Sequence, residues 1–387
     1  MPRPLRTRYH LVFLLVVLSS LASRTSAWAA GPPTTGSLRI LWQQELPPYP
    51  SGPALDIRWA SDSSVFLAWS KEGVFEVALD GKFSPVRAVI PDPEHHFRGY
   101  EILATSPEYI VTSSQFKSMA FRPRALQPTG LVAIKKVPVG IVEGMDISGH
   151  ELALLGNPAM LPAPKGAVAW LGDLSEHPEK DLKPLPVLDR GASNPETWDG
   201  RSLANCSTLE VGAIRFLPDR SLLVVPGFEP GAFLFSSGGR LLRSWDAAAL
   251  GLDTSPDCAT MTKDEKSKLA MSIAARFDFL NKHRVLDDIL PLAAGPGLLI
   301  RFVENDKIHW ELRVLESGER ISTFQVPFVG ELPYERLRGD VRVNKIVLLK
   351  AAHGFDFTKK SPFTSDLVVV AELPRAAQAT AEKGGGR

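Results

Sequence analysis

The sequence lacks an excess of either charge. Its 44 basic and 43 acidic residues leave a formal net charge of +1 over 387 residues. A phosphate-binding surface normally needs a basic excess, so the composition excludes nucleic acid as a main partner. Hydrophobic residues make up 44% of the chain, which is enough to bury a core and excludes a chain that is disordered throughout.

The sequence also lacks an apolar run long enough to span a bilayer. Its longest, Leu11–Leu21, has roughly a dozen residues where about 20 are needed. An A-x-A site, Ala27–Ala29, follows it, and three basic residues precede it: Arg3, Arg6 and Arg8. This pattern predicts a signal peptide over residues 1–30 and a secreted or periplasmic protein without a membrane span. The alternative is an uncleaved membrane anchor.

Cysteine is nearly absent, with Cys206 and Cys258 the two in the chain. Neither closely follows the apolar run, which excludes a lipid anchor on cysteine. In an exported protein an even pair is typical of one disulfide bond, so we predict that Cys206 and Cys258 are joined. Two buried free thiols are the alternative.

Catalytic signatures are missing as well. The sequence contains no Gly-x-Ser-x-Gly elbow, phosphate loop, dinucleotide fingerprint or His-Glu-x-x-His motif. Nucleophilic or cofactor chemistry therefore has no support from motifs, and we predict no cofactor, with a bound calcium ion as the exception considered below.

What the sequence does contain is a recurring four-strand unit, best seen in Leu55–Ile90. Four short apolar segments there are separated by three turns rich in Ser, Asp, Lys and Gly. The same plan recurs at roughly 40- to 50-residue spacing. The later units begin near Gly99, Val142, Leu209, Leu286 and Leu337, and the last one lacks its fourth strand.

A spare strand, Leu38–Leu46, precedes the first unit. If it pairs as the outer strand of the last unit, the repeats close into a ring without an open seam. Strands that are apolar on both faces, such as Val65–Trp69, fit sheets covered on both sides by neighbours. Two sandwich domains are the structural alternative.

With these repeats the chain resembles the six-bladed β-propeller superfamily, which includes NHL-type and TolB-type propellers. The resemblance covers residues 38–374 and concerns topology and turn placement, without the signature of one family. It implies an all-β fold of four-stranded antiparallel blades. Residues 31–37 are expected to form a flexible lead and residues 375–387 a disordered tail.

One amphipathic helix is predicted as an insertion over about residues 259–283, between the fourth and fifth units. Thr262 and Glu265 form a capping box at its start. An apolar stripe follows, formed by Leu269, Ile273, Phe277 and Leu280. We expect the stripe to pack on the propeller; a groove of a partner protein is the alternative.

The long connections of the chain fall mainly on one face of the predicted ring, namely the connections between units and between second and third strands. Variable loops on a rigid scaffold usually carry binding, so this face is predicted to be functional. Cys206 and Cys258 lie in two of these connections. The candidate contact residues there are His95, His96, Trp198, Asp199 and Arg201.

A carboxylate stands near the head of each innermost strand: Asp56, Glu101, Glu143, Glu210, Asp288 and Asp340. In the third unit Asp146 is an alternative, but the distance to the turn serine favours Glu143. Converging carboxylates at the channel mouth could hold Ca²⁺ or a cationic ligand. Solvated rim charges, or carboxylates bonded to backbone N–H groups, are the alternative interpretation.

Two functions of different classes follow. The first is a monomeric, exported, non-catalytic scaffold that binds a protein, peptide or glycan on its long-loop face. The second is a metal-dependent hydrolase or lactonase, because the resemblance to six-bladed lactonases implies a cation held over the channel by acids and asparagines. The asparagines of that family are not identifiable here. A quinone-dependent oxidoreductase is disfavoured, since the units lack a regular tryptophan docking motif.

Overall fold

The computed structural model divides the chain into two compact units, Met1–Pro33 and Thr34–Arg387, and the described residues all belong to the second. They are residues 35–46, 54–69, 73–80, 82–83, 85–91, 102–113, 116–124, 133–157, 168–175, 177–187, 212–227, 231–253, 262, 264–265, 268–269, 272–315, 321–332, 335–352, 366–374 and 377. Within these ranges no helix combines the length and apolar character needed to cross a membrane.

The first three blades are antiparallel and four-stranded, as the repeats predict. Blade 1 consists of β3 (Ala54–Trp59), β4 (Ser64–Trp69), β5 (Gly73–Ala78) and β6 (Pro85–Pro91). Blade 2 consists of β7 (Ile102–Thr105), β8 (Tyr109–Ser113), β9 (Phe116–Pro123) and the first part of β10 (Ala133–Ser148). Blade 3 consists of the rest of β10, β11 (Glu151–Asn157), β12 (Ala169–Asp173) and β13 (Lys183–Pro184), with the short helix α2 (Pro178–Asp181) before β13.

Strand β10 joins blades 2 and 3 into one seven-stranded sheet. Its first part, to Lys136, pairs with β9 as an outer strand. From Ile141 it pairs with β11 as the innermost strand of blade 3. The ladder is irregular between Lys136 and Ile141, where the chain passes from one blade to the next without a loop.

The other three blades follow the same plan. Blade 4 consists of β14 (Ala213–Phe216), β15 (Leu222–Val225), β16 (Gly231–Phe235) and β17 (Leu241–Asp246). Blade 5 consists of β18 (Val285–Leu290), β19 (Gly297–Glu304), β20 (Lys307–Leu315) and β21 (Ile321–Gln325). Blade 6 consists of β22 (Glu335–Arg342), β23 (Lys345–Ala352), β24 (Leu367–Glu372) and, from the other end of the chain, β2 (Arg39–Glu45).

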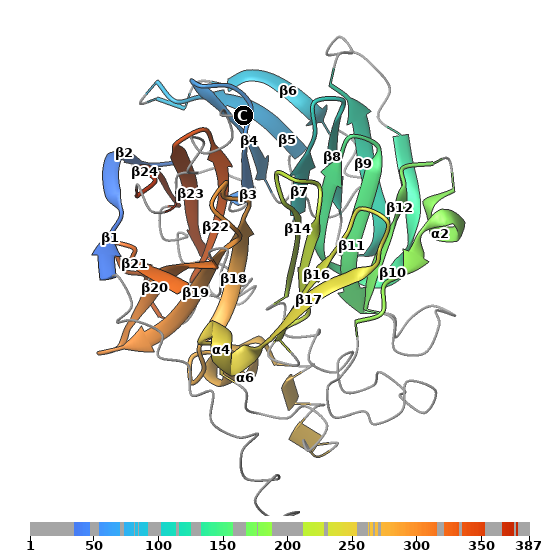
Figure 1. Ribbon diagram of the computed structural model, residues 1–387. Coiled ribbons are helices and arrows are strands. Elements are labelled where there is room, and N and C mark those ends of the chain that lie inside the picture. Colours follow the sequence, from blue (N-terminus) through green and yellow to red (C-terminus); the bar gives the residue numbers. More distant parts are fainter. Residues whose placement is uncertain are drawn as a thin grey trace, which may run out of the picture. The chain divides into compact units, whose positions relative to one another are not determined.

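The blades form a closed ring, and the predicted closure is confirmed. Each innermost strand contacts the innermost strand of the next blade, and β22 of the last blade contacts β3 of the first. Strand β2 pairs antiparallel with β24, from Arg39 opposite Glu372 to Glu45 opposite Leu367. Figure 1 shows the two strands beside each other. The protein is therefore a six-bladed β-propeller in which the spare N-terminal strand supplies the missing strand of blade 6.

The ring contains one strand that the sequence did not predict. Residues 35–37, expected to be part of a flexible lead, form β1 (Thr35–Ser37), which pairs in parallel with β21. Gly36 lies opposite Phe324, and a Cβ at Gly36 would stand 2.9 Å from the Phe324 ring. Strands β1 and β2 therefore form an N-terminal strap that adds a strand to blade 5 and then completes blade 6.

The hydrophobic core lies between blades. Six clusters of buried apolar side chains each fill the interface of two neighbouring blades. One of them packs Trp310 of blade 5 against Leu348 of blade 6, both fully buried. This arrangement is why all six side chains of β3 and of β4 are buried, as strands covered on both faces require.

The insertion between blades 4 and 5 contains the short helix α4 (Ala247–Leu250) and the helix α6 (Ile273–Leu280). The capping box is present, since the Glu265 N–H donates to the Thr262 hydroxyl at 3.2 Å and the Thr262 N–H donates to Glu265 at 2.8 Å. Ser272 is extended and caps α6 by accepting from the Ala275 N–H, so α6 begins within the predicted insertion, after the capping box. The stripe packs on the propeller as predicted, with Phe277 and Leu280 buried against Val285 of β18.

Candidate functional site

Four of the six predicted ring acids belong to the described residues: Asp56, Glu143, Asp288 and Asp340. Glu101 and Glu210 lie outside them. So do the loop candidates His95, His96, Trp198, Asp199 and Arg201, and the predicted disulfide partners Cys206 and Cys258. Predictions that rest on those residues stay predictions.

The channel acids connect neighbouring blades through the main chain. Asp56 of β3 accepts the Leu103 N–H of blade 2 at 2.8 Å, and Asp288 of β18 accepts the Gly339 N–H of blade 6 at 3.0 Å. Asp340 of β22 accepts the Trp59 N–H of blade 1 at 2.9 Å. Each carboxylate thus replaces a strand-to-strand hydrogen bond between innermost strands that are not paired in a sheet.

In blade 3 this contact is made by Asp146, which accepts the Phe216 N–H of blade 4 at 2.8 Å. Glu143, the residue favoured by the sequence register, is buried and lies where the ladder of β10 skips one residue between Val142 and Gly144. The ladders of blades 1 and 5 skip Leu55 and Asp287 in the same way. Because blade 1 has the same bulge and Asp56 was a reference for the count to the turn serine, the bulge does not explain the preference for Glu143; Asp146 lies three residues farther along β10.

Arginines in the channel were not predicted as site residues. Arg58 Nη1 lies 2.6 Å from Asp56 Oδ1 and 3.4 Å from the Gly339 carbonyl oxygen of blade 6. The sequence does carry a signal for it, because Asp56 and Arg58 are two residues apart on one strand and therefore share a face. Arg338 and Asp340 repeat this spacing on β22, where Arg338 lies 3.8 Å from Asp288.

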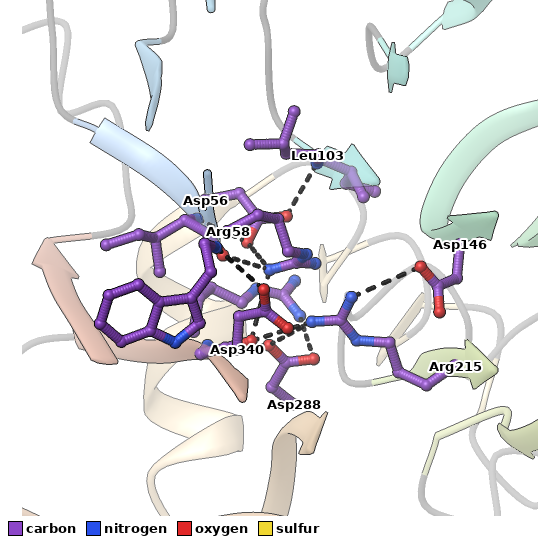
Figure 2. Close-up of polar contacts among 12 residues, drawn as sticks. Asp56, Arg58, Leu103, Asp146, Arg215, Asp288 and Asp340 are labelled. Atoms are coloured by element: carbon purple, nitrogen blue, oxygen red, sulfur yellow. Dashed lines mark hydrogen bonds and ion pairs between the residues drawn. The ribbon is translucent and has the colours of Figure 1, made fainter. Parts of the chain in front are cut away.

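Arg215 of blade 4 makes the widest set of contacts, and Figure 2 shows it between Asp146 and the group formed by Asp288 and Asp340. Its Nε donates to the Ile289 carbonyl at 3.2 Å and its Nη2 to the Gly339 carbonyl at 2.9 Å. Its Nη1 lies 3.5 Å from Asp146 Oδ1 and its Nη2 3.7 Å from Asp288 Oδ2. One side chain therefore links blades 3, 4, 5 and 6.

Asp287, the buried residue that precedes Asp288 on β18, connects blades 5 and 6 beside this network. Its Oδ2 accepts the Trp310 indole N–H at 2.6 Å and the Leu337 N–H at 2.9 Å. Its Oδ1 lies 3.9 Å from Nε of both Arg301 and Arg336. Asp287 and Asp288 thus accept hydrogen bonds from two N–H groups of β22 that are two residues apart, those of Leu337 and Gly339.

Burial and charge act in opposite directions on the acids of the network. Burial raises the pKa of Asp146 above 3.8, more than Arg215 and Arg58 lower it. Burial would also raise the pKa of Asp288, but Arg215, Arg338 and Arg58 together hold it below 3.8. Burial alone would lower the pKa of Arg215. The nearby carboxylates raise it by more, so the pKa lies above its usual value and Arg215 stays charged; these are Asp288, Asp146, Asp340 and Asp56.

This chemistry differs from that of an open carboxylate ring. Asp56, Asp146, Asp288 and Asp340 direct oxygen atoms at backbone N–H groups, and Asp56, Asp146 and Asp288 also face guanidinium groups. Within the described residues, no three His, Cys, Asp or Glu side chains are grouped so that they could hold a metal ion. Because Glu101 and Glu210 lie outside these residues, the predicted cation ring as a whole stays a prediction.

The antiparallel ladders place the connections between blades, and the connections from second to third strands, on one face of the ring. We call it the long-connection face. Its described part includes the segment Val326–Leu332 between blades 5 and 6, where Val329 and Leu332 are each 41% exposed. Gly330 and Ile308 exchange two backbone hydrogen bonds, of 2.7 and 3.0 Å, which hold this segment in place.

Comparison with known proteins gives no family assignment: no family model matches the sequence. No curated protein matches it either. The fold is similar to the WD40 repeats of RRP9, with 12% identity, a TM-score of 0.48, and 87% of this chain and 99% of that chain covered. Virginiamycin B lyase from Staphylococcus aureus is similar at 10% identity and a TM-score of 0.42, covering 86% of this chain and 99% of that chain.

A third similar structure is the β-propeller domain of Myceliophteria_thermophila Cps50 (Swd1), with 12% identity, a TM-score of 0.40, and 87% of this chain and 100% of that chain covered. At these identities and TM-scores, the three likenesses say nothing about what this chain binds or does. The function must therefore be argued from its own residues.

Proposed function

We propose that this protein is an exported, non-catalytic propeller scaffold that binds a protein, peptide or glycan ligand through its long-connection face. The observation that carries the proposal is the pair of exposed apolar side chains, Val329 and Leu332, on a segment that two backbone hydrogen bonds hold on that face. Export rests on the signal-peptide pattern of residues 1–30 alone.

Hydrogen bonds order the segment in the free protein. The N–H and the carbonyl of Gly330 both bond to the backbone of Ile308, and the Glu331 N–H donates to the Glu335 carboxylate at 2.8 Å. Lys307 donates to both carboxylate oxygens of Glu331 at 2.8 Å, which lowers the pKa of Glu331. A segment that is ordered in the free protein loses little conformational entropy on binding, which favours affinity.

The chemistry of the segment suits a protein or peptide best. Val329 and Leu332 offer apolar contacts, and the exposed Lys307–Glu331 ion pair on the same segment offers polar ones. An apolar centre with a polar rim is the usual composition of protein-binding surfaces. The channel acids support the non-catalytic part of the proposal, because they are engaged by backbone N–H groups and arginines.

The proposal can be tested by site-specific photo-crosslinking in the producing organism. A photoreactive residue replaces Val329 or Leu332 and, as a matched control, Val343. Val343 is 87% exposed and lies in the β22–β23 turn on the opposite face. We expect a discrete crosslinked species from Val329 and Leu332 that is absent from Val343.

The variants Val329→Asp and Leu332→Asp should abolish this crosslink from the neighbouring position while leaving the thermal midpoint unchanged, because both side chains are exposed. Equal crosslinking from both faces would contradict the proposal, and so would the absence of both a crosslink from the long-connection face and binding to immobilised glycans. If the ligand is a glycan, the protein forms no protein adduct but binds immobilised glycans, and Val329→Asp and Leu332→Asp weaken that binding.

A further inference from the structure

The contacts of Arg215 define a small enclosure in the channel, formed by the carboxylates of Asp146 and Asp288 and the carbonyls of Ile289 and Gly339. We call this set the Arg215 cage. The Arg215 side chain is 4% exposed, and those of Asp146 and Asp288 are 9% and 3% exposed. The cage therefore holds a charged group almost out of contact with water.

The shape of the cage suits a planar, forked cation. Two nitrogens of Arg215 donate to two carbonyls from different blades, at 3.2 and 2.9 Å. The third nitrogen, Nη1, lies 3.5 Å from the Asp146 carboxylate, and Nη2 also lies 3.7 Å from the Asp288 carboxylate. A guanidinium directs its donors in this fixed fork, whereas an ammonium or a metal ion is a point charge.

Gly339 positions one wall of the cage. Its N–H donates to Asp288 and its carbonyl accepts from both Arg215 and Arg58. A Cβ at this position would lie 2.9 Å from the Leu348 side chain, 3.0 Å from that of Leu290 and 3.0 Å from the Val347 carbonyl oxygen, so a side chain would crowd its neighbours. The cage is thus built by the fold and does not depend on Arg215 alone.

We propose that the Arg215 cage is a guanidinium-binding site which the protein fills with its own side chain. Arg215 takes the place that a divalent cation would take in an acid-lined channel, and its charge is balanced by carboxylates from other blades. It follows that Ca²⁺ does not stabilise the native protein by binding in the cage. It also follows that removal of the Arg215 side chain leaves a cage that a free guanidinium compound can occupy.

The test uses Arg215→Ala with ethylguanidinium as the probe. The variant should unfold about 5 to 10 °C below the wild type, because buried carboxylates lose their cation. Millimolar ethylguanidinium should restore part of this loss, and equimolar ethylammonium or CaCl₂ should restore clearly less. The matched control is Arg220→Ala, whose side chain is 62% exposed and pairs with Glu151 at 3.0 Å; ethylguanidinium should not change its midpoint.

Two further variants keep the proposal testable if Arg215→Ala does not fold. Arg215→Lys keeps the charge and loses the fork, so its midpoint should fall below that of the wild type. In the double variant Arg215→Met with Asp288→Asn, the drop in midpoint should be smaller than the sum of the single drops, because both charged partners are gone.

Three results would overturn the proposal. One is recovery of Arg215→Ala by ethylammonium as fully as by ethylguanidinium. Another is strict additivity of the Arg215 and Asp288 substitutions. The third is a Ca²⁺-dependent rise in the wild-type midpoint that Asp288→Asn removes, since that would place a metal ion in the cage.

Discussion

At the scale of single residues, the two carboxylates of the Arg215 cage have opposite relations to pH. The pKa of Asp288 is held below 3.8 by three arginines, so its ionised form stabilises the folded protein. This contribution is complete above about pH 3.8 and is lost as the pH falls through the folded-state pKa. The pKa of Asp146 is raised by burial, so its ionisation at neutral pH costs stability, and this cost disappears as the pH falls.

The two aspartates should therefore respond differently to replacement by asparagine. At pH 7, Asp288→Asn should lower the free energy of unfolding by about 1 to 3 kcal/mol. Asp146→Asn should leave it unchanged or raise it, since asparagine resembles the protonated form that burial favours. Urea unfolding of both variants and the wild type at pH 7 and pH 5 measures this difference, and equal losses at pH 7 would contradict it.

At the scale of secondary-structure elements, the β22–β23 turn is one of the turns that place a non-glycine residue at a positive φ. Arg342 pairs with Lys345, so the turn consists of Val343 and Asn344. Val343 has φ of +56°, in the left-handed region, where a Cβ costs roughly 1 to 2 kcal/mol. Its side chain is 87% exposed and gains no packing in return.

Val343→Gly should therefore raise the free energy of unfolding by about 0.5 to 1 kcal/mol, because glycine adopts this φ without a steric penalty and loses part of the gain to backbone entropy. Val343→Ala is the matched control, since it shortens the side chain and keeps the Cβ. Chemical denaturation measures both. A gain in the alanine variant equal to that in the glycine variant would contradict the steric explanation.

At the scale of the whole ring, the N-terminal strap closes the structure. Strand β2 supplies the outer strand of blade 6, and β1 adds an edge strand to blade 5. Closed β repeats have no seam at which another chain can pair, and an open blade would expose the edge of β24. The strap is thus expected to matter for both stability and solubility.

Deletion of residues 35–46 should lower the thermal midpoint by several degrees or more and promote self-association, because the backbone groups of β24 lose their partners. A synthetic peptide with the sequence of residues 35–46 should restore monodispersity when added in excess. Calorimetry and light scattering measure the two effects. An unchanged midpoint would mean that blade 6 is stable with three strands.

Much of the fold followed from local patterns. The alternation of apolar segments and turns predicted the blades, and the missing fourth strand of the last unit predicted its pairing with the N-terminal strand. The capping box of Thr262 and Glu265 formed as expected. Ser272 was not recognised as a second cap, because its bond to the Ala275 N–H competes with a helix that the apolar stripe alone would continue.

The site was predicted less completely. Sequence spacing identified Asp56, Asp288 and Asp340 as channel residues, because strand position and charge are both visible in the chain. It favoured Glu143 and left Asp146 as the alternative, because the distance to the turn serine does not show which carboxylate accepts the N–H of the next blade. The cation ring stays a prediction, and the alternative interpretation, hydrogen bonds to backbone N–H groups, describes the contacts of Asp56, Asp288 and Asp340.

What the sequence by itself determined is the number of blades, their strand order and the closing role of the N-terminal strand, because these depend on periodicity and turn residues along the chain. What only the tertiary structure decided is the partner of each channel charge. Arg215 and Asp288 are 73 positions apart, and Arg215 and Gly339 are 124 apart, yet they touch across the channel. Such contacts depend on how the blades twist and where their ladders bulge, and no local pattern records either.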